Sequence, residues 1–100
     1  MEFKEIEEKV NNTFKKYCEE YNIKIDENFA ILKAQEEFGE FIKSYIISKK
    51  LCRPEKFLPT DEAKKELSKE LADAVGTLMV VANLLDINLE EAIIKKWINR

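Results

Sequence analysis

The sequence of 100 residues contains no histidine. This absence excludes Ser-His-Asp and Cys-His catalysis, and it excludes any zinc or iron site that needs an imidazole ligand. If the chain performs chemistry, the reacting groups must be carboxylates, lysines, hydroxyls or a hard metal ion.

Cysteines, long apolar runs and an excess of positive charge are also scarce or missing. Cys18 and Cys52 are the only two cysteines and have no C-x-x-C spacing, which predicts reduced thiols in a cytoplasmic protein. No apolar run approaches the roughly 20 residues that span a bilayer, and the charged segment 1–10 lacks the apolar core of a signal peptide. The formal net charge is −3. We therefore expect neither a membrane nor a nucleic acid polymer as a partner.

Only two glycines and two prolines interrupt the chain, and both prolines fall in the segment 51–59. That segment is the one strong break in the sequence. With 45% hydrophobic and 37% charged residues, the composition is that of a globular domain rather than a disordered chain. We expect a single domain over residues 1–100.

Apolar residues recur at steps of three and four in three long segments, and no segment shows sustained strand alternation. The segments cover about residues 2–21, 26–50 and 60–85. Asp26 can cap the second helix, and Asn88 with Glu91 three residues later can cap a short last helix. The pattern predicts an all-α fold.

The third predicted helix is apolar almost all round between Leu71 and Leu85. Such a helix is normally buried on most sides, and four helices in so short a chain can hardly bury it that fully. The sequence therefore predicts a homo-oligomer in which this helix packs against a partner subunit.

Two acidic pairs, each with a spacing of three, fall on the predicted second and third helices. They are Glu37 with Glu40, and Glu70 with Asp73. Each pair shares one helix face and borders the apolar stripe, where like charges repel and burial disfavours them. Lysines could compensate, but a divalent cation held by four converging oxygens does so better. Carboxylates without nitrogen or sulfur ligands suit Mg²⁺ or Mn²⁺.

Both glycines lie next to these acids inside predicted helices, Gly39 within the first pair and Gly76 just after the second. An interior glycine costs about 1 kcal/mol relative to alanine. Their placement predicts a close approach of helices near the site.

The order of these acids resembles the MazG-type all-α nucleoside triphosphate pyrophosphohydrolases. The family signature is E-x-x-E, a variable spacer and E-x-x-D, which residues 37–40 and 70–73 meet. Glu36 matches the doubled glutamate often seen in the family. The resemblance covers about residues 30–92.

The resemblance implies a fold and a reaction. The fold is a four-helix bundle-like subunit completed by oligomerisation as a homodimer or homotetramer. The reaction is hydrolysis of a nucleoside or deoxynucleoside triphosphate to the monophosphate and pyrophosphate, for housecleaning of the nucleotide pool. Mg²⁺ or Mn²⁺ would be held by the four acidic positions.

The resemblance also implies roles for further residues. Glu36 or Glu37 would orient or deprotonate the attacking water. Lys96, Asn99 and Arg100 resemble the family's ending and would bind phosphate oxygens and a sugar or base edge.

Two alternatives remain open at this point. One is phosphoribosyl-ATP pyrophosphohydrolase, a relative with similar acidic helices. The other is a non-enzymatic helical oligomerisation module, which predicts no metal dependence. The base and sugar preference, the number of metal ions, the carboxylate that activates water, and dimer versus tetramer also remain open.

Overall fold

A computed structural model describes residues 1–99, and Arg100 lies outside the described residues. All regular structure in this range is helical, which confirms the all-α prediction. The elements are α1 (Phe3–Glu20), α2 (Glu27–Ser48), a short 3-10 turn (Pro54–Lys56), α3 (Thr60–Leu84), α4 (Leu89–Ile93) and a π-helical turn (Ile94–Ile98) that continues α4. No helix within residues 1–99 has the length and apolarity that crossing a membrane requires.

Local side-chain chemistry explains where two helices begin. The Asp26 carboxylate accepts a hydrogen bond of 2.8 Å from the backbone N–H of Phe29 and so caps α2. The Asn88 side chain accepts one of 3.1 Å from the N–H of Glu91 and caps α4. Both caps are those that the sequence predicts.

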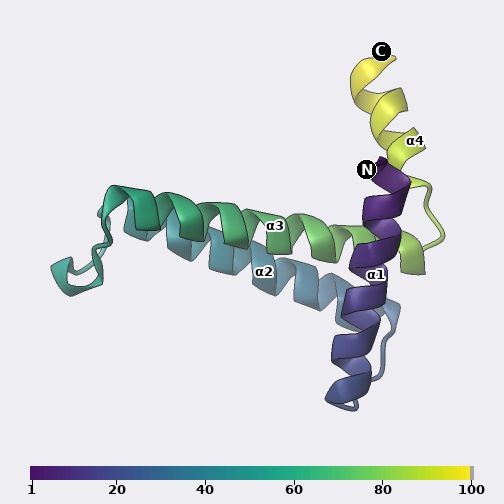
Figure 1. The fold of residues 1–100 in the computed structure, drawn as a ribbon, viewed down its shortest axis with the longest axis horizontal. Helices are drawn as coiled ribbons and strands as arrows, with labels where there is room; N and C mark the ends of the chain where they lie inside the picture. Colours follow the sequence, from purple (N-terminus) through teal and green to yellow (C-terminus); the bar gives the residue numbers. More distant parts are fainter. Residues whose placement is uncertain (100) are drawn as a thin grey trace.

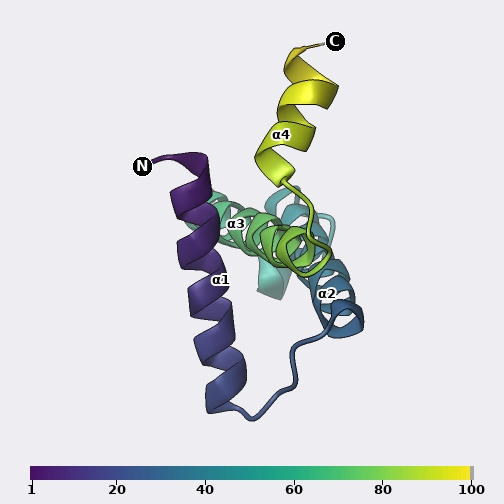
Figure 2. The same ribbon diagram turned by 90° about the vertical axis from the view of Figure 1, so that its right-hand side faces the viewer.

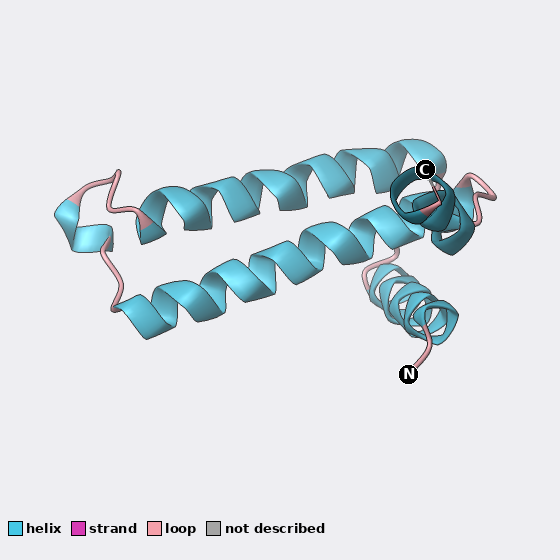
Figure 3. Cartoon of the chain, turned by 90° about the horizontal axis from the view of Figure 1, so that it is seen from above, coloured by secondary structure: helices cyan, strands magenta, loops and turns pink. Residues whose placement is uncertain are grey.

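Helices α2 and α3 lie side by side and run antiparallel (Figure 3). The loop that carries both prolines joins them at one end. The buried residues of α2 are Ala30 and Ala34, and those of α3 include Ala63 and Ala74. Small side chains let two helices approach closely, so this pair is the frame on which the acidic residues are held.

Helix α1 crosses the end of this pair where α2 begins and α3 ends (Figures 1 and 2). A Cβ atom built on Gly76 would lie 3.6 Å from the side chain of Val10, so α1 packs closely over α3 at this point. The expected close approach is therefore found at Gly76. The same prediction is wrong for Gly39 within one chain, because a Cβ atom built there would meet nothing within 4 Å.

Helix α4 and its π-helical turn project away from the other helices (Figures 1 and 2). The described part of one chain is therefore a helical pair with α1 across one end, not a closed bundle of four helices.

The fold leaves an unusually large surface for its size. The accessible surface is 7808 Å², whereas a compact monomer of this mass exposes about 5,900 Å². The radius of gyration is 15.8 Å, against about 13 Å for a compact domain of this length. The part of α3 that is apolar almost all round, between Leu71 and Leu85, is only partly covered, since Leu78 remains 53% exposed. One chain alone does not bury α3 on all sides.

Candidate metal centre

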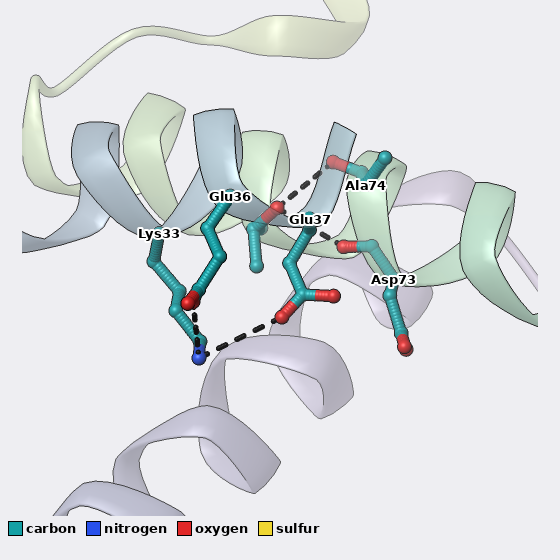
Figure 4. A network of polar contacts seen from close by, with 6 residues as sticks. Lys33, Glu36, Glu37, Asp73 and Ala74 are labelled. Atoms are coloured by element: carbon teal, nitrogen blue, oxygen red, sulfur yellow. Dashed lines mark hydrogen bonds and ion pairs between the residues drawn. The ribbon is translucent and has the colours of Figure 1, made fainter. Parts of the chain in front are cut away.

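Three carboxylates converge where α2 faces α3. Glu70 and Asp73 lie one turn apart on α3, and Glu37 faces them from α2. One oxygen from each of the three side chains lies within 4.8 Å of the others. The close-up in Figure 4 shows Glu37 and Asp73 on their two helices. The antiparallel pairing thus brings together acids that lie far apart in the sequence.

The surroundings of Glu37 disfavour its charge. Its side chain is 16% exposed and that of Glu70 is 14% exposed, while Asp73 is open to solvent. Burial is the main effect that raises the pKa of the Glu37 carboxyl, and the nearby charge of Asp73 raises it further. Lys33 opposes this shift but does not cancel it. The cluster therefore holds more negative charge than its neighbours compensate.

Two lysines contact the cluster. The Lys33 ammonium lies 3.6 Å from Glu37 and donates a hydrogen bond of 2.8 Å to Glu36 (Figure 4). That hydrogen bond is the main effect that raises the pKa of Lys33. Lys69 lies 4.0 Å from Glu70 and is largely exposed. No ion pair within residues 1–99 involves Asp73.

The backbone that carries Asp73 is held by a buried hydroxyl. The Thr77 hydroxyl donates to the backbone carbonyl oxygens of Asp73 and Ala74, each 3.0 Å away. This contact ties the threonine side chain to its own helix, so that it presents no free donor to the acids.

Two grooves meet at the cluster. The larger, of about 560 Å³, lies between α1 and the α2–α3 pair and contains Glu37 and Asp73. Its other lining residues include Val10, Phe14, Tyr17, Lys33 and Val80. The smaller, of about 420 Å³, contains Glu70 and Glu40 between α2 and α3, and its lining is mostly charged. The cluster therefore separates an apolar groove from a polar one.

The donor set fits a hard divalent cation. Three carboxylates converge, two of them are half-buried, and no nitrogen or sulfur atom belongs to the group. Mg²⁺ and Mn²⁺ prefer such oxygen ligands, and Mg²⁺ usually completes its coordination with water and substrate phosphates.

The remaining predicted site residues lie outside this group. Glu40 lines the smaller groove beside Glu70. Glu36 is exposed and bonded to Lys33. Lys96 and Asn99 belong to the projecting C-terminal segment, and among the described residues neither lines either groove (Figure 1). Arg100 lies outside the described residues, so its predicted role has no structural counterpart here.

The sequence alone does not reveal that α1 forms a wall of the site. Phe14 and Tyr17 belong to the apolar stripe of α1, and that stripe was visible in the sequence. The periodicity predicts that these residues pack against another part of the protein, but it does not predict that they line the groove beside Glu37.

Comparisons with known proteins add no assignment. The chain matches no protein-family model, no curated protein and no solved structure.

Proposed function

We propose that this protein hydrolyses a nucleoside triphosphate to the monophosphate and pyrophosphate with the help of Mg²⁺, as the resemblance to the MazG-type enzymes implies. The observation that carries the proposal is the convergence of Glu37, Glu70 and Asp73 beside an apolar groove. Three of the four acids in the signature come together across two helices, as a shared ligand would require.

The three converging carboxylates would hold Mg²⁺. Glu40, one turn after Glu37 and beside Glu70 in the smaller groove, would join them as a fourth ligand from that side. When bound, Mg²⁺ neutralises triphosphate charge and lowers the pKa of a coordinated water.

Glu36 or Glu37 would accept the proton of the attacking water. The water oxygen forms a bond to phosphorus as the bond to the departing pyrophosphate breaks, and the proton passes to the carboxylate. Glu36 suits this role better, because it is exposed and lies outside the converging group. Glu37 is already engaged with the other two acids.

The larger groove would take the nucleoside. Its wall from α1 offers Phe14 and Tyr17 beside the acids, with a volume of about 560 Å³. Aromatic side chains stack on any base, so this wall favours binding of a nucleobase without fixing which one.

The active form would be a homodimer or homotetramer built on a large exposed apolar face. The 3.6-residue repeat turns one apolar row of each helix away from the α2–α3 contact, on the side opposite to the acids. Because the helices are antiparallel, both rows lie on the same face of the pair. This apolar face consists of Ile31, Phe38, Ile42 and Tyr45 of α2 and Leu71, Val75, Leu78 and Leu85 of α3, all of them exposed in the single chain.

A second copy packed on this apolar face would complete a four-helix bundle from two helical pairs. It would also offer a route for Lys96 and Asn99 to take part. Their segment projects away from α2 and α3 (Figure 2), so we expect any contact of Lys96 and Asn99 with an acidic site to be with that of a neighbouring copy.

A non-enzymatic oligomerisation module is the second candidate, and the same exposed apolar face favours it. It would bury that face without using the acids and would show no metal dependence. Phosphoribosyl-ATP pyrophosphohydrolase remains an enzymatic alternative, because it would need the same carboxylates.

One assay separates these candidates. The purified protein is incubated with a panel of ribo- and deoxyribonucleoside triphosphates and with phosphoribosyl-ATP, with Mg²⁺ or with EDTA, and pyrophosphate is measured. We expect release from at least one nucleoside triphosphate that EDTA abolishes. The absence of metal-dependent release from every substrate would refute both enzyme proposals.

Variants locate the activity at the cluster. Asp73→Asn and Glu40→Gln should each abolish turnover, because each removes a charged ligand, while the helical circular dichroism spectrum is unchanged. Asp61→Asn, an exposed acid in the first turn of α3, is the matched control and should keep full activity. A loss of helicity in Asp73→Asn would instead indicate a structural role.

A further inference from the structure

Lys33 occupies a special position in the acidic site. It lies one turn before Glu37 on α2, with its side chain 26% exposed. Its ammonium lies 2.8 Å from Glu36 and 3.6 Å from Glu37 (Figure 4). The same side chain lines the larger groove together with Glu37 and Asp73. Lys33 therefore borders both the carboxylates and the space proposed for the nucleotide.

The second lysine at the cluster is not equivalent. Lys69 lies 4.0 Å from Glu70, and its side chain is 64% exposed. Water and salt screen such an exposed charge much more than a half-buried one. Lys69 also lines neither of the two grooves that contain the cluster residues. Within residues 1–99, Lys33 is thus the cation that most strongly compensates the acidic cluster.

Lysine is suited to a change of partner. Its ammonium is a compact charge at the end of four rotatable methylene groups, so it can leave one anion for another without any movement of the backbone. A divalent cation held by Glu37 would repel it, whereas phosphate oxygens in the adjoining groove would attract it.

We propose that Lys33 is the internal counter-ion of the acidic site and exchanges partners during ligand binding. In the metal-free protein it compensates part of the charge of Glu37. When that carboxylate takes a divalent cation, Lys33 leaves it and contacts the phosphate oxygens of the anionic substrate in the larger groove. The inference rests on the proposed function, because it assumes that the cluster holds a metal and that the groove holds a polyphosphate.

The exchange predicts opposite effects on the two ligands. Loss of the ammonium leaves the cluster more negative, so it should bind a divalent cation more tightly. The same loss removes a charge-assisted contact to phosphate, so it should weaken the binding of the anion. A side chain with a purely structural role would weaken both.

The test measures binding by calorimetry rather than turnover. Mn²⁺ alone is titrated into the wild type and into Lys33→Met, and we expect the variant to bind about tenfold more tightly. Inorganic pyrophosphate is then titrated at a fixed saturating concentration of Mg²⁺, and we expect Lys33→Met to bind it about tenfold more weakly.

Two variants serve as controls. Lys33→Arg keeps the positive charge and should keep the metal affinity of the wild type within a small factor. Lys69→Met removes the exposed lysine on the other side of the cluster and should change both affinities little. Circular dichroism spectra and melting curves verify that each variant is folded.

The inference and the proposed function fail in different ways. If the wild type binds Mn²⁺ but Lys33→Met binds it equally or more weakly, the counter-ion role is refuted and the metal site stands. If Lys33→Met binds pyrophosphate as tightly as the wild type, the exchange of partners is refuted. If the wild type binds no divalent cation, the proposed function is refuted and this inference with it.

Discussion

At the scale of single residues, Glu37 shows how a candidate ligand affects the stability of its own protein. Its carboxyl is half-buried beside two other acids, and burial together with the charge of Asp73 raises its pKa. A carboxyl with a higher pKa in the folded state binds its proton more tightly there than in the unfolded chain. Its contribution to stability is therefore greatest at low pH and is lost as the pH rises through the folded pKa.

We predict that Glu37→Gln stabilises the metal-free protein at pH 7. The substitution removes a charge that the fold disfavours, so the melting temperature in EDTA should rise, and this advantage should vanish at pH values below the ordinary range of a glutamate. Melting curves by circular dichroism at several pH values would measure this. Glu40→Gln, at an exposed position on the same helix, is the matched control.

Added Mg²⁺ should reverse the order of the melting temperatures of the wild type and Glu37→Gln. It should raise the melting temperature of the wild type and leave that of Glu37→Gln nearly unchanged, because a ligand stabilises only the folded state that binds it. A variant that is less stable than the wild type in EDTA at pH 7 would mean that the Lys33–Glu37 ion pair outweighs the burial of the acid.

The two cysteines should differ in reactivity. Cys18 lies on the buried face of α1 and is completely buried, and this burial raises the pKa of its thiol, whereas Cys52 is half-buried in the loop before the 3-10 turn. The thiolate is the reactive form, so the Cys18 thiol is both inaccessible to a reagent and harder to ionise. Limited alkylation with iodoacetamide followed by mass spectrometry should modify Cys52 first. Similar rates for both in the native protein would contradict the packing of α1.

At the scale of elements, the ends of helices were predictable because their chemistry is local. Asp26 and Asn88 each bond to an N–H three residues away, and such a contact needs no information about the rest of the fold. The spacing of the acids likewise shows which of them share a face.

The ligand set was only partly predictable, because it depends on the register of two helices. Spacing places Glu37 and Glu40 together, but it does not tell which of them faces Glu70 and Asp73. The structure brings Glu37 into the group and leaves Glu40 in the smaller groove. The crossing of α1, which supplies Tyr17 to the larger groove, depends on tertiary packing in the same way.

The cap of α2 gives a test at this scale. Asp26→Ala should destabilise the protein by about 1 kcal/mol, since it leaves the N–H of Phe29 without its side-chain partner. For a chain of this length that is a fall of roughly 4–8 °C in melting temperature. Asp26→Asn still offers an oxygen acceptor and should lose much less. An equal loss in both variants would show that the charge of Asp26, not its hydrogen bond, matters.

At the scale of the whole molecule, the 3.6-residue repeat places the apolar face and the acidic cluster on opposite sides of the α2–α3 pair. An assembly through the apolar face would leave the cluster and both grooves of each copy open to substrate. The excess surface of the chain, about 1,900 Å² above that of a compact monomer, exceeds the roughly 800 Å² that each partner buries in a standard interface. The excess belongs to the whole chain, and the projecting C-terminal segment with its exposed Trp97 and Ile98 contributes to it as well as the apolar face.

Leu78→Lys should therefore disrupt self-association. Leu78 lies in the middle of the apolar face and is 53% exposed in the single chain, so a lysine there can be solvated in a monomer but would be buried in the assembly. Light scattering on the eluted protein should show the wild type as a dimer or tetramer and the variant as a monomer, with a melting temperature that no longer depends on concentration. Asn83→Lys, an exposed position on α3 outside the apolar face, should stay assembled. A wild type that is monomeric at micromolar concentration would refute the proposed assembly, because the chain would then be stable with this surface exposed. The metal site would be unaffected by that result, because the pyrophosphate assay tests it separately.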